Sequence, residues 1–279
     1  MANAGNREQF LGTESEFVSF LNSFNTDEFR QQLASSHNIH INEVKRLTDI
    51  YFGEMLHGYR FLETRMPGGK LRILEVGAGL GLISIFLHRR GHEVVALEPA
   101  GLGFDFFEAT KKEIWKIAGT DTPKLAEKPA EELSPESDGL FDFSFSINVM
   151  EHIQDIETAT SAILSVLKPD GISVNSCPNY IVPYEPHFAI PIVPFSPAAT
   201  RWLFSKKIST DTALWDSFNF ITWRLVRKMA RDGNVDVIFE QALIYNSFIR
   251  LGSDEEFMKR HKDGPVGWLY RFLKATKLL

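Results

Sequence analysis

Between residues 71 and 177 the chain alternates short apolar runs with longer amphipathic stretches, and this order restricts the fold more than any other feature. The amphipathic stretches are 9–15 residues long and have helical spacing of their apolar residues. Strands that alternate with helices form βαβ units and a parallel sheet. The predicted strands are 71–77, 93–98, 124–127, 140–147 and 171–177, and the predicted helices between them are 82–90, 104–118 and 157–167.

Further elements flank this alternating region. Apolar positions at helical spacing predict a helix over residues 41–64, and a second helix is expected near residues 216–231. Residues 235–240 and 242–249 are two strand candidates close enough to form a hairpin. We therefore predict an α/β fold, namely a Rossmann-like, doubly wound, seven-stranded and mostly parallel sheet with an antiparallel edge hairpin and N-terminal helices.

Composition excludes several classes of protein. The single cysteine, Cys177, rules out an internal disulfide, so we interpret it as a packed residue in a reducing compartment and expect a cytoplasmic protein. The first ten residues lack a signal-peptide pattern, and no apolar run is long enough to span a bilayer. Residues 201–279 carry 14 Lys and Arg against 9 Asp and Glu, which is too weak a basic excess to favour nucleic-acid binding.

Three glycines follow the first predicted strand, in the stretch ILEVGAGLG. The spacing Gly77-Ala78-Gly79-Leu80-Gly81 is not the dinucleotide GxGxxG pattern, because Leu82 stands at the third glycine position. A phosphate loop is also excluded, since no Lys-Ser/Thr pair follows. Glycine at such a turn allows a ligand to approach the backbone closely. At the end of the next strand, the Glu98 carboxylate is placed to accept hydrogen bonds from both hydroxyls of a ribose.

These motifs, followed by AEEL, FDFSFSINVMEHI and LKPDGISVNSCPN, resemble the class I S-adenosylmethionine-dependent methyltransferases over roughly residues 70–180. The resemblance implies that the glycines line the methionine end of S-adenosyl-L-methionine, that Glu98 holds its ribose, and that Ala130 and Glu131 lie beside its adenine. Pro129 stands where related sequences commonly carry aspartate. The residues expected to bind the cofactor are Glu75, Gly77, Ala78, Gly79, Gly81, Glu98, Ala130, Glu131 and Asn148.

The segment NVMEH, residues 148–152, is similar to the ExxEH pattern of ubiquinone-pathway O-methyltransferases and small-RNA 2′-O-methyltransferases, in which it can bind a divalent metal. Asn148 replaces the first glutamate, and His187 is a further candidate ligand in the loop downstream. Three interpretations are open for Glu151, His152 and His187: a structural role, a metal-free acid/base role with a histidine taking a hydroxyl proton, or metal ligation. The neutral Asn148 favours the metal-free role, so we commit to these three as catalytic residues and to no metal.

The proposed domains follow from this resemblance: a helical extension over residues 1–66 and a methyltransferase domain over residues 67–279, with a proline-rich substrate-side insertion at 177–215. Polar and aromatic residues of that insertion, at 179–180 and 184–188, are candidates to bind a sugar or a phenol. A C-terminal amphipathic segment with Trp268, Leu269 and Phe272 on one side predicts a helix that docks on the core; the alternative is peripheral contact with a membrane.

We expect an enzyme that O-methylates a hydroxyl of a glycan or a small metabolite. The alternatives are a methyltransferase for quinones or natural-product phenols, and a non-catalytic binding module with the same fold. The intact glycine turn together with Glu98 argues against the binding module. The sequence does not indicate the oligomeric state.

Overall fold

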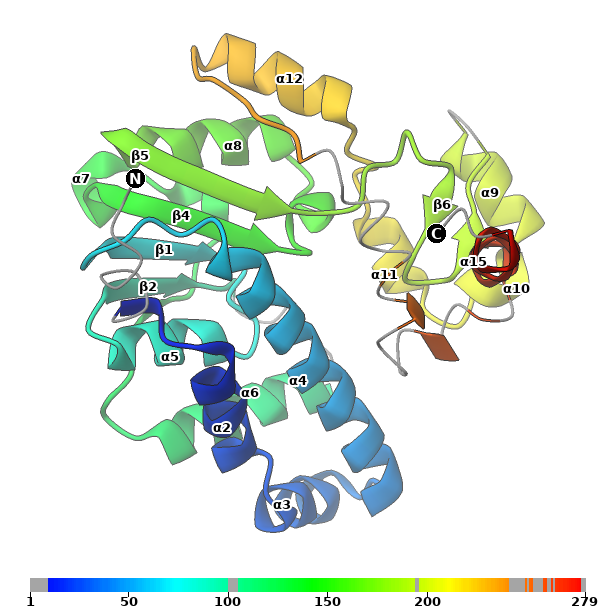
Figure 1. Cartoon of the computed structure of the whole chain (residues 1–279), viewed down its shortest axis with the longest axis horizontal. Helices are drawn as coiled ribbons and strands as arrows, with labels where there is room; N and C mark the ends of the chain where they lie inside the picture. Colours follow the sequence, from blue (N-terminus) through cyan, green and yellow to red (C-terminus); the bar gives the residue numbers. More distant parts are fainter. Residues whose placement is uncertain are drawn as a thin grey trace. The chain divides into compact units, whose positions relative to one another are not determined.

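The computed structural model describes residues 10–99, 105–193, 196–240, 249, 251–252, 258–259, 262 and 264–276 (Figure 1). The chain divides into two compact units. Unit 1 contains Met1–Met150 and Asp155–Ser176, and unit 2 contains Glu151–Gln154 and Cys177–Leu279. The predicted domain boundary at residue 66 stays a prediction.

Unit 1 is built on a sheet of five parallel strands in the order β3-β2-β1-β4-β5. The strands are β1 (Arg72–Val76), β2 (Glu93–Leu97), β3 (Lys124–Ala126), β4 (Phe141–Ile147) and β5 (Leu167–Ser176). All five were predicted from their apolar runs. β5 begins four residues earlier than predicted, because the register against β4 shifts between Phe141 and Phe143 and the strand continues across that irregularity.

The prediction of a seven-stranded sheet with an edge hairpin is wrong for the part of the chain that the structure describes. Residues 235–240 form no strand, and Ile238 is almost fully exposed. Residues 242–248, most of the second candidate strand, lie outside the described residues. Strand propensity alone does not hold a strand without a neighbour to pack against. An antiparallel hairpin does occur, in unit 2, between β6 (Tyr184–Glu185) and β7 (Ile190–Pro191).

Helices cover both faces of the unit 1 sheet (Figure 1). The crossovers from β1 to β2 and from β2 to β3 run in one direction across the sheet, whereas the crossover from β4 to β5 runs in the other. Right-handed crossovers therefore place α5 and α6 on one face and α8 on the opposite face. The elements are α2 (Glu14–Phe24), α3 (Asp27–His37), α4 (Ile41–Glu63), α5 (Leu82–Arg89), α6 (Asp105–Ala118), η1 (Ala130–Glu132), α7 (Pro135–Asp138), η2 (Met150–His152) and α8 (Ile156–Ser165).

The N-terminal helices share their core with the sheet. The rings of Phe17 and Tyr59 stack 4.4 Å apart, and both pack edge-on against Phe86 of α5. The buried Tyr59 hydroxyl donates a hydrogen bond to the Gly12 carbonyl at 2.9 Å. N-terminal helices were predicted, although only α4 was given individual bounds. A capping box that pairs Thr13 with Glu16 starts α2, so a local signal for this helix was present in the sequence.

Glu75 of β1 is buried beneath the glycine turn, where its carboxyl accepts a hydrogen bond from the Ser84 hydroxyl of α5. Burial raises the pKa of Glu75 to about 8. The side chain is therefore mostly protonated near neutral pH and couples β1 to α5 as a neutral group. The Glu75–Ser84 hydrogen bond therefore connects the two elements that flank the glycine turn.

Unit 2 contains the hairpin and several short helices. The helices are α9 (Pro197–Leu203), α10 (Ser205–Ile208), α11 (Thr212–Ser217), α12 (Trp223–Asp232) and α15 (Pro265–Ala275). Buried residues of α10 and α11 share a core cluster with the hairpin residue Ile190. The predicted helix over 216–231 begins instead at Trp223. The chain breaks between α11 and α12 because Phe220 adopts a positive φ of 53° and the Asn219 side chain accepts the Ile221 N–H, so the Thr222 side chain starts a new helix.

The helical prediction for the C-terminal segment is confirmed by α15, but the expected docking of its apolar side is wrong. Trp268 is 63% exposed and Phe272 is 48% exposed, and their rings stack on each other 5.8 Å apart. An amphipathic pattern shows that a helix has an apolar side without showing that the side is covered. Among the described helices, none is both long and apolar enough to cross a bilayer.

We predict that replacing Trp268 and Phe272 together with serine changes the free energy of unfolding by less than about 0.5 kcal/mol, since exposed side chains contribute little to stability. Phe17→Ala, at a fully buried position, serves as the contrast and should cost about 3–5 kcal/mol. Urea denaturation of the three proteins measures both values. A loss above about 2 kcal/mol in the serine double variant would show that this side of α15 is covered.

We also predict that Glu75→Gln flattens the pH dependence of stability. Between the unfolded pKa of 4.5 and the folded pKa of about 8, folding takes up a proton at Glu75. The parent therefore loses stability as pH rises through this range, by up to about 1.4 kcal/mol per pH unit. The glutamine variant has no such proton and should lose less. Glu136→Gln, on exposed α7, should retain the profile of the parent, and identical profiles for all three proteins would contradict a protonated Glu75.

Candidate functional site

In the glycine turn after β1, neighbouring side chains fill the space beside two of the three glycines and leave space beside the other one. Gly77, Gly79 and Gly81 all have positive φ, of 69°, 55° and 77°. A side chain at Gly77 would collide with Val149, and one at Gly81 would lie 2.7 Å from Trp115. Among the described residues, an added Cβ at Gly79 would meet only Phe107, at 3.4 Å. The first and third glycines are therefore required by the packing of the protein, whereas Gly79 leaves room for a ligand.

Glu98 lies directly after β2, and its carboxylate faces the same turn. Its Oε2 accepts a hydrogen bond from the Gly79 N–H at 2.9 Å, which fixes the orientation of the side chain. Burial raises the pKa of Glu98, while the Gly79 N–H and the nearby Lys111 act in the opposite direction. The carboxylate can accept further hydrogen bonds beyond this one.

The remaining residues expected at the cofactor site also follow strand ends. Ala130 and Glu131 begin η1 after β3, where Ala130 is buried and Glu131 is half-buried. Asn148 follows β4, is exposed, and has a positive φ of 54°; its N–H donates to the Ser176 carbonyl at 2.7 Å. Because parallel strands end at one edge of a sheet, these residues share the edge that carries the glycine turn.

In unit 2, Glu151, His152 and His187 form a cluster although 35 residues separate the two histidines. Each offers a ligand atom, and these atoms lie within 4.8 Å of one another. Glu151 has no exposed surface, and among the described residues neither of its carboxylate oxygens has a hydrogen-bond partner. His152 Nε2 lies 3.8 Å from Glu151 Oε1, too far for a hydrogen bond.

Burial shifts the pKa values of Glu151 and His152 toward the neutral forms. It raises the pKa of Glu151 to about 7 and lowers the pKa of His152 to about 4. His187 acts against the first shift and adds to the second. A buried carboxylate without hydrogen bonds costs free energy unless a proton or a cation accompanies it.

The cluster rests on neighbours in the chain segment 217–219, which the sequence analysis did not single out. His152 Nδ1 lies 2.7 Å from the Ser217 hydroxyl, and the Phe218 ring lies 5.1 Å from each imidazole ring. The Asn219 N–H donates to the Glu151 carbonyl at 2.8 Å. These residues follow the EH pair by about 65 positions, and no motif connects the two segments.

The proline-rich insertion is packed more tightly than expected. Tyr180, Glu185 and Phe188 were candidates to bind an acceptor, but all three side chains are buried. Glu185 instead accepts hydrogen bonds from His187 and from backbone N–H groups of its own loop. Cys177, in the same unit, is half-buried, and burial raises the pKa of its thiol to about 12.

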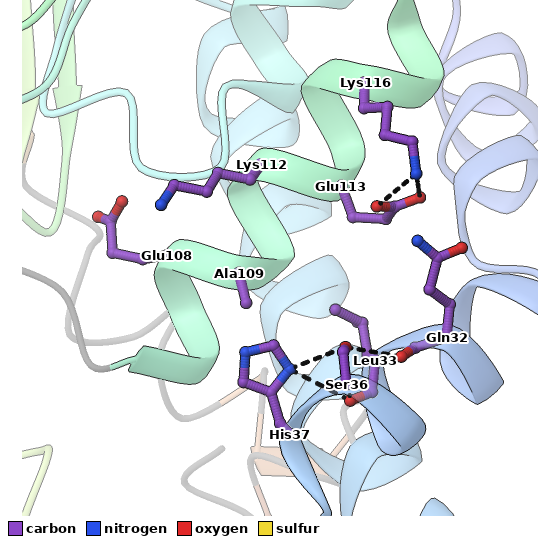
Figure 2. Close-up of a pocket in the computed structure, with 9 residues that line it drawn as sticks. All are labelled: Gln32, Leu33, Ser36, His37, Glu108, Ala109, Lys112, Glu113 and Lys116. Carbon is purple, nitrogen blue, oxygen red and sulfur yellow. Dashed lines mark hydrogen bonds and ion pairs between the residues drawn. The ribbon is translucent and has the colours of Figure 1, made fainter.

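An open pocket of about 510 Å³ lies between α3 and α6 (Figure 2). Figure 2 shows charged side chains along its α6 wall, where Lys116 pairs with Glu113 at 3.2 Å, and His37 on the opposite wall. No residue of the expected cofactor site or of the Glu151 cluster lines this pocket. We assign it no role.

Comparison with known proteins identifies the kind of domain that unit 1 contains. A family model described as a methyltransferase domain matches residues 74–174. An uncharacterised protein of Mycobacterium tuberculosis is 35% identical over 209 residues, which cover 72% of this chain and 70% of that protein. The ubiquinone biosynthesis O-methyltransferase of Psychrobacter cryohalolentis is 29% identical over 108 residues, covering 39% of this chain and 41% of that protein.

Among solved structures, an S-adenosylmethionine-dependent methyltransferase from Mesorhizobium loti superposes with a TM-score of 0.51 and 17% identity, over 72% of this chain and 90% of that one. At this identity the likeness concerns the fold alone. The family model covers the glycine turn, Glu98 and β4. The chain therefore belongs to the class I S-adenosylmethionine-dependent methyltransferases and is an enzyme that uses S-adenosyl-L-methionine.

Proposed function

We propose that this enzyme transfers the methyl group of S-adenosyl-L-methionine to a hydroxyl oxygen of a glycan or another small hydroxylated metabolite. In this reaction an O–C bond forms as the S–C bond of the sulfonium breaks, and the hydroxyl proton leaves to a base. The observation that carries the proposal is the cluster of Glu151, His152 and His187, in which two imidazoles lie beside a buried carboxylate that has no hydrogen-bond partner among the described residues. A hydroxyl needs such groups because it is a weak nucleophile until its proton is removed.

For the cofactor, we propose that Glu98 accepts hydrogen bonds from the ribose hydroxyls and that the methionine end lies over Gly79. The Gly79–Glu98 hydrogen bond supports this placement, because it fixes the carboxylate beside the open position of the turn. Ala130 and Glu131 would flank the adenine, with Asn148 at the end of the neighbouring strand. Glu75, being buried, would act by holding the turn.

The cluster in unit 2 also fits a divalent cation. Both oxygens of buried Glu151 lack partners among the described residues, and a mixture of carboxylate and imidazole is a common donor set for zinc and other divalent metals. Glu151, His152 and His187 would hold the cation, which when bound lowers the pKa of a hydroxyl that binds to it. In the sequence, the neutral Asn148 favours a metal-free site. In the structure, the Glu151 carboxylate without a partner among the described residues favours a bound cation instead.

The pKa of His152 decides its role both with and without a bound cation. A histidine with a pKa of about 4 is neutral at pH 7, which is the form a metal ligand requires. The same low pKa makes His152 a poorly matched general base near neutrality, since the best bases titrate near the working pH. Glu151 and His187 would therefore carry more of the proton transfer if no cation binds.

The alternative acceptor is a quinol or another phenol. The similarity to a ubiquinone biosynthesis O-methyltransferase, at 29% identity over 108 residues, supports it. A catechol has two adjacent hydroxyls, as many sugars do, so the cluster fits both classes. Transfer of labelled methyl groups to catechols, quinols and methyl glycosides, assayed in parallel, separates the two alternatives.

We predict that Glu98→Ala weakens binding of S-adenosyl-L-methionine by about 2–3 kcal/mol, because charge-assisted hydrogen bonds to the ribose are lost. Gly79→Ala should also weaken binding by filling the open position. The matched controls are Glu93→Ala at the opposite end of β2, and Gly119→Ala, which has a positive φ and nothing within 4 Å of an added Cβ. Calorimetry measures all five proteins. Parental affinity in both site variants would place the cofactor elsewhere.

We further predict that EDTA lowers methyl transfer at least about 10²-fold and that Mn²⁺, Mg²⁺ or Zn²⁺ restores it. Glu151→Gln should be as damaging as His152→Ala, whereas His88→Ala, in unit 1, should leave the rate unchanged. Full activity in EDTA would exclude the cation. In that case a loss of about 10²–10⁴-fold on changing one histidine identifies it as a base, and unchanged turnover in both histidine variants removes either role.

A further inference from the structure

The hydrogen bonds around Ser217 define which nitrogen of His152 carries the proton. The Ser217 hydroxyl lies 2.7 Å from the Leu214 carbonyl oxygen and 2.7 Å from His152 Nδ1. A carbonyl can only accept, so the single hydroxyl proton of Ser217 points to Leu214. Toward His152 the serine oxygen must therefore act as an acceptor, which requires a proton on Nδ1. In the neutral ring, Nε2 is then the acceptor nitrogen.

The hydrogen bonds of Glu185 define in the same way which nitrogen of His187 carries the proton. Its Oε1 lies 2.6 Å from His187 Nδ1 and also accepts the His187 backbone N–H at 3.1 Å. Its Oε2 accepts the Phe188 N–H at 2.6 Å. A carboxyl group that accepts these backbone N–H groups acts as the acceptor toward the imidazole as well, so His187 also carries its proton on Nδ1.

We infer that Ser217 and Glu185 are positioning residues, which hold His152 and His187 in the Nδ1–H form so that each ring presents its Nε2 lone pair. The inference rests on the proposed function, in which Nε2 either binds a cation or takes a hydroxyl proton. Residues that hold metal-binding histidines through the other ring nitrogen fix both tautomer and ring orientation. The Ser217 hydroxyl at the end of α11 and the Glu185 carboxylate of β6 would do this here.

The effect of the Ser217 hydroxyl on the His152 ring can be separated from the contacts that hold the 151–154 backbone. The 151–154 segment is held independently, because the Asn219 side chain donates to the Ile153 carbonyl at 2.8 Å and the Gln154 side chain donates to the Ser217 carbonyl at 2.7 Å. Removing only the Ser217 hydroxyl leaves these hydrogen bonds in place. Ser217→Ala therefore changes the partner of His152 without removing the contacts that hold its backbone.

The test uses the full chain labelled with ¹⁵N-histidine, with His152 and His187 assigned from His→Gln variants. The parent should show both rings in the Nδ1–H form. In Ser217→Ala, His152 should shift toward the other tautomer while His187 is unchanged, and the affinity for Mn²⁺ added alone should fall about 10–100-fold. Ser217→Thr retains a hydroxyl and should restore both. Ser209→Ala is the matched control, since Ser209 also bonds a carbonyl three residues earlier but lies outside the cluster.

A proton on Nε2 of either ring in the parent would overturn the inference for that ring. An unchanged His152 tautomer in Ser217→Ala would overturn it for Ser217. Failure of the proposed function has a different signature: a parent that binds no Mn²⁺ and methylates no hydroxyl, with both histidines still in the Nδ1–H form. That result would support the positioning role and reject the chemistry assigned to the cluster. Calorimetry with S-adenosyl-L-methionine verifies that each variant keeps a folded unit 1.

Discussion

The parallel pairing of β1 with β2 on one side and β4 on the other determines where the residues proposed to bind the cofactor lie. Because these strands run in the same direction, the turns that follow them emerge at one edge of the sheet. The turn after β1 can be as tight as it is only because Gly77 and Gly81 accept Val149 and Trp115 against their backbones. That close packing leaves Gly79 exposed to a ligand and brings its N–H to Glu98. The proposed cofactor site is thus a consequence of how the centre of the sheet is packed.

The second organising constraint is the buried carboxylate of Glu151. Removing a carboxylate from water without hydrogen bonds is costly, and a fold keeps such a group only when something compensates for it. Here the neighbours are two imidazoles whose Nδ1 atoms already bond to Ser217 and Glu185. The centre of the cluster consequently holds acceptors and lacks a donor among the described side chains. A proton at Glu151 or a bound cation resolves this imbalance, and in the proposed function it is the cation that would activate the acceptor hydroxyl.

Much of unit 1 could be predicted from sequence because its signals are local. Apolar runs predict the strands, and the glycines predict the turn after β1. The position of Glu98 directly after β2 follows from the length of that strand. The capping box at Thr13 shows that even α2 had a local signal. The features that were not predicted depend on contacts between segments far apart in the sequence. Exposure of Trp268 depends on what packs against α15, and the strand candidate at 235–240 lacks a partner in the described chain. Ser217 reaches His152 from 65 residues away, which no spacing rule indicates.

The most direct test of the account is anomalous diffraction from crystals of the full chain grown with Mn²⁺ and the demethylated cofactor. We predict one Mn²⁺ peak coordinated by Glu151 and by the Nε2 atoms of His152 and His187, with the Nδ1 atoms still bonded to Ser217 and Glu185. The cofactor ribose should contact Glu98. A cluster without an anomalous peak, in which the Glu151 carboxylate has acquired protein donors instead, would contradict the proposed activation of the acceptor.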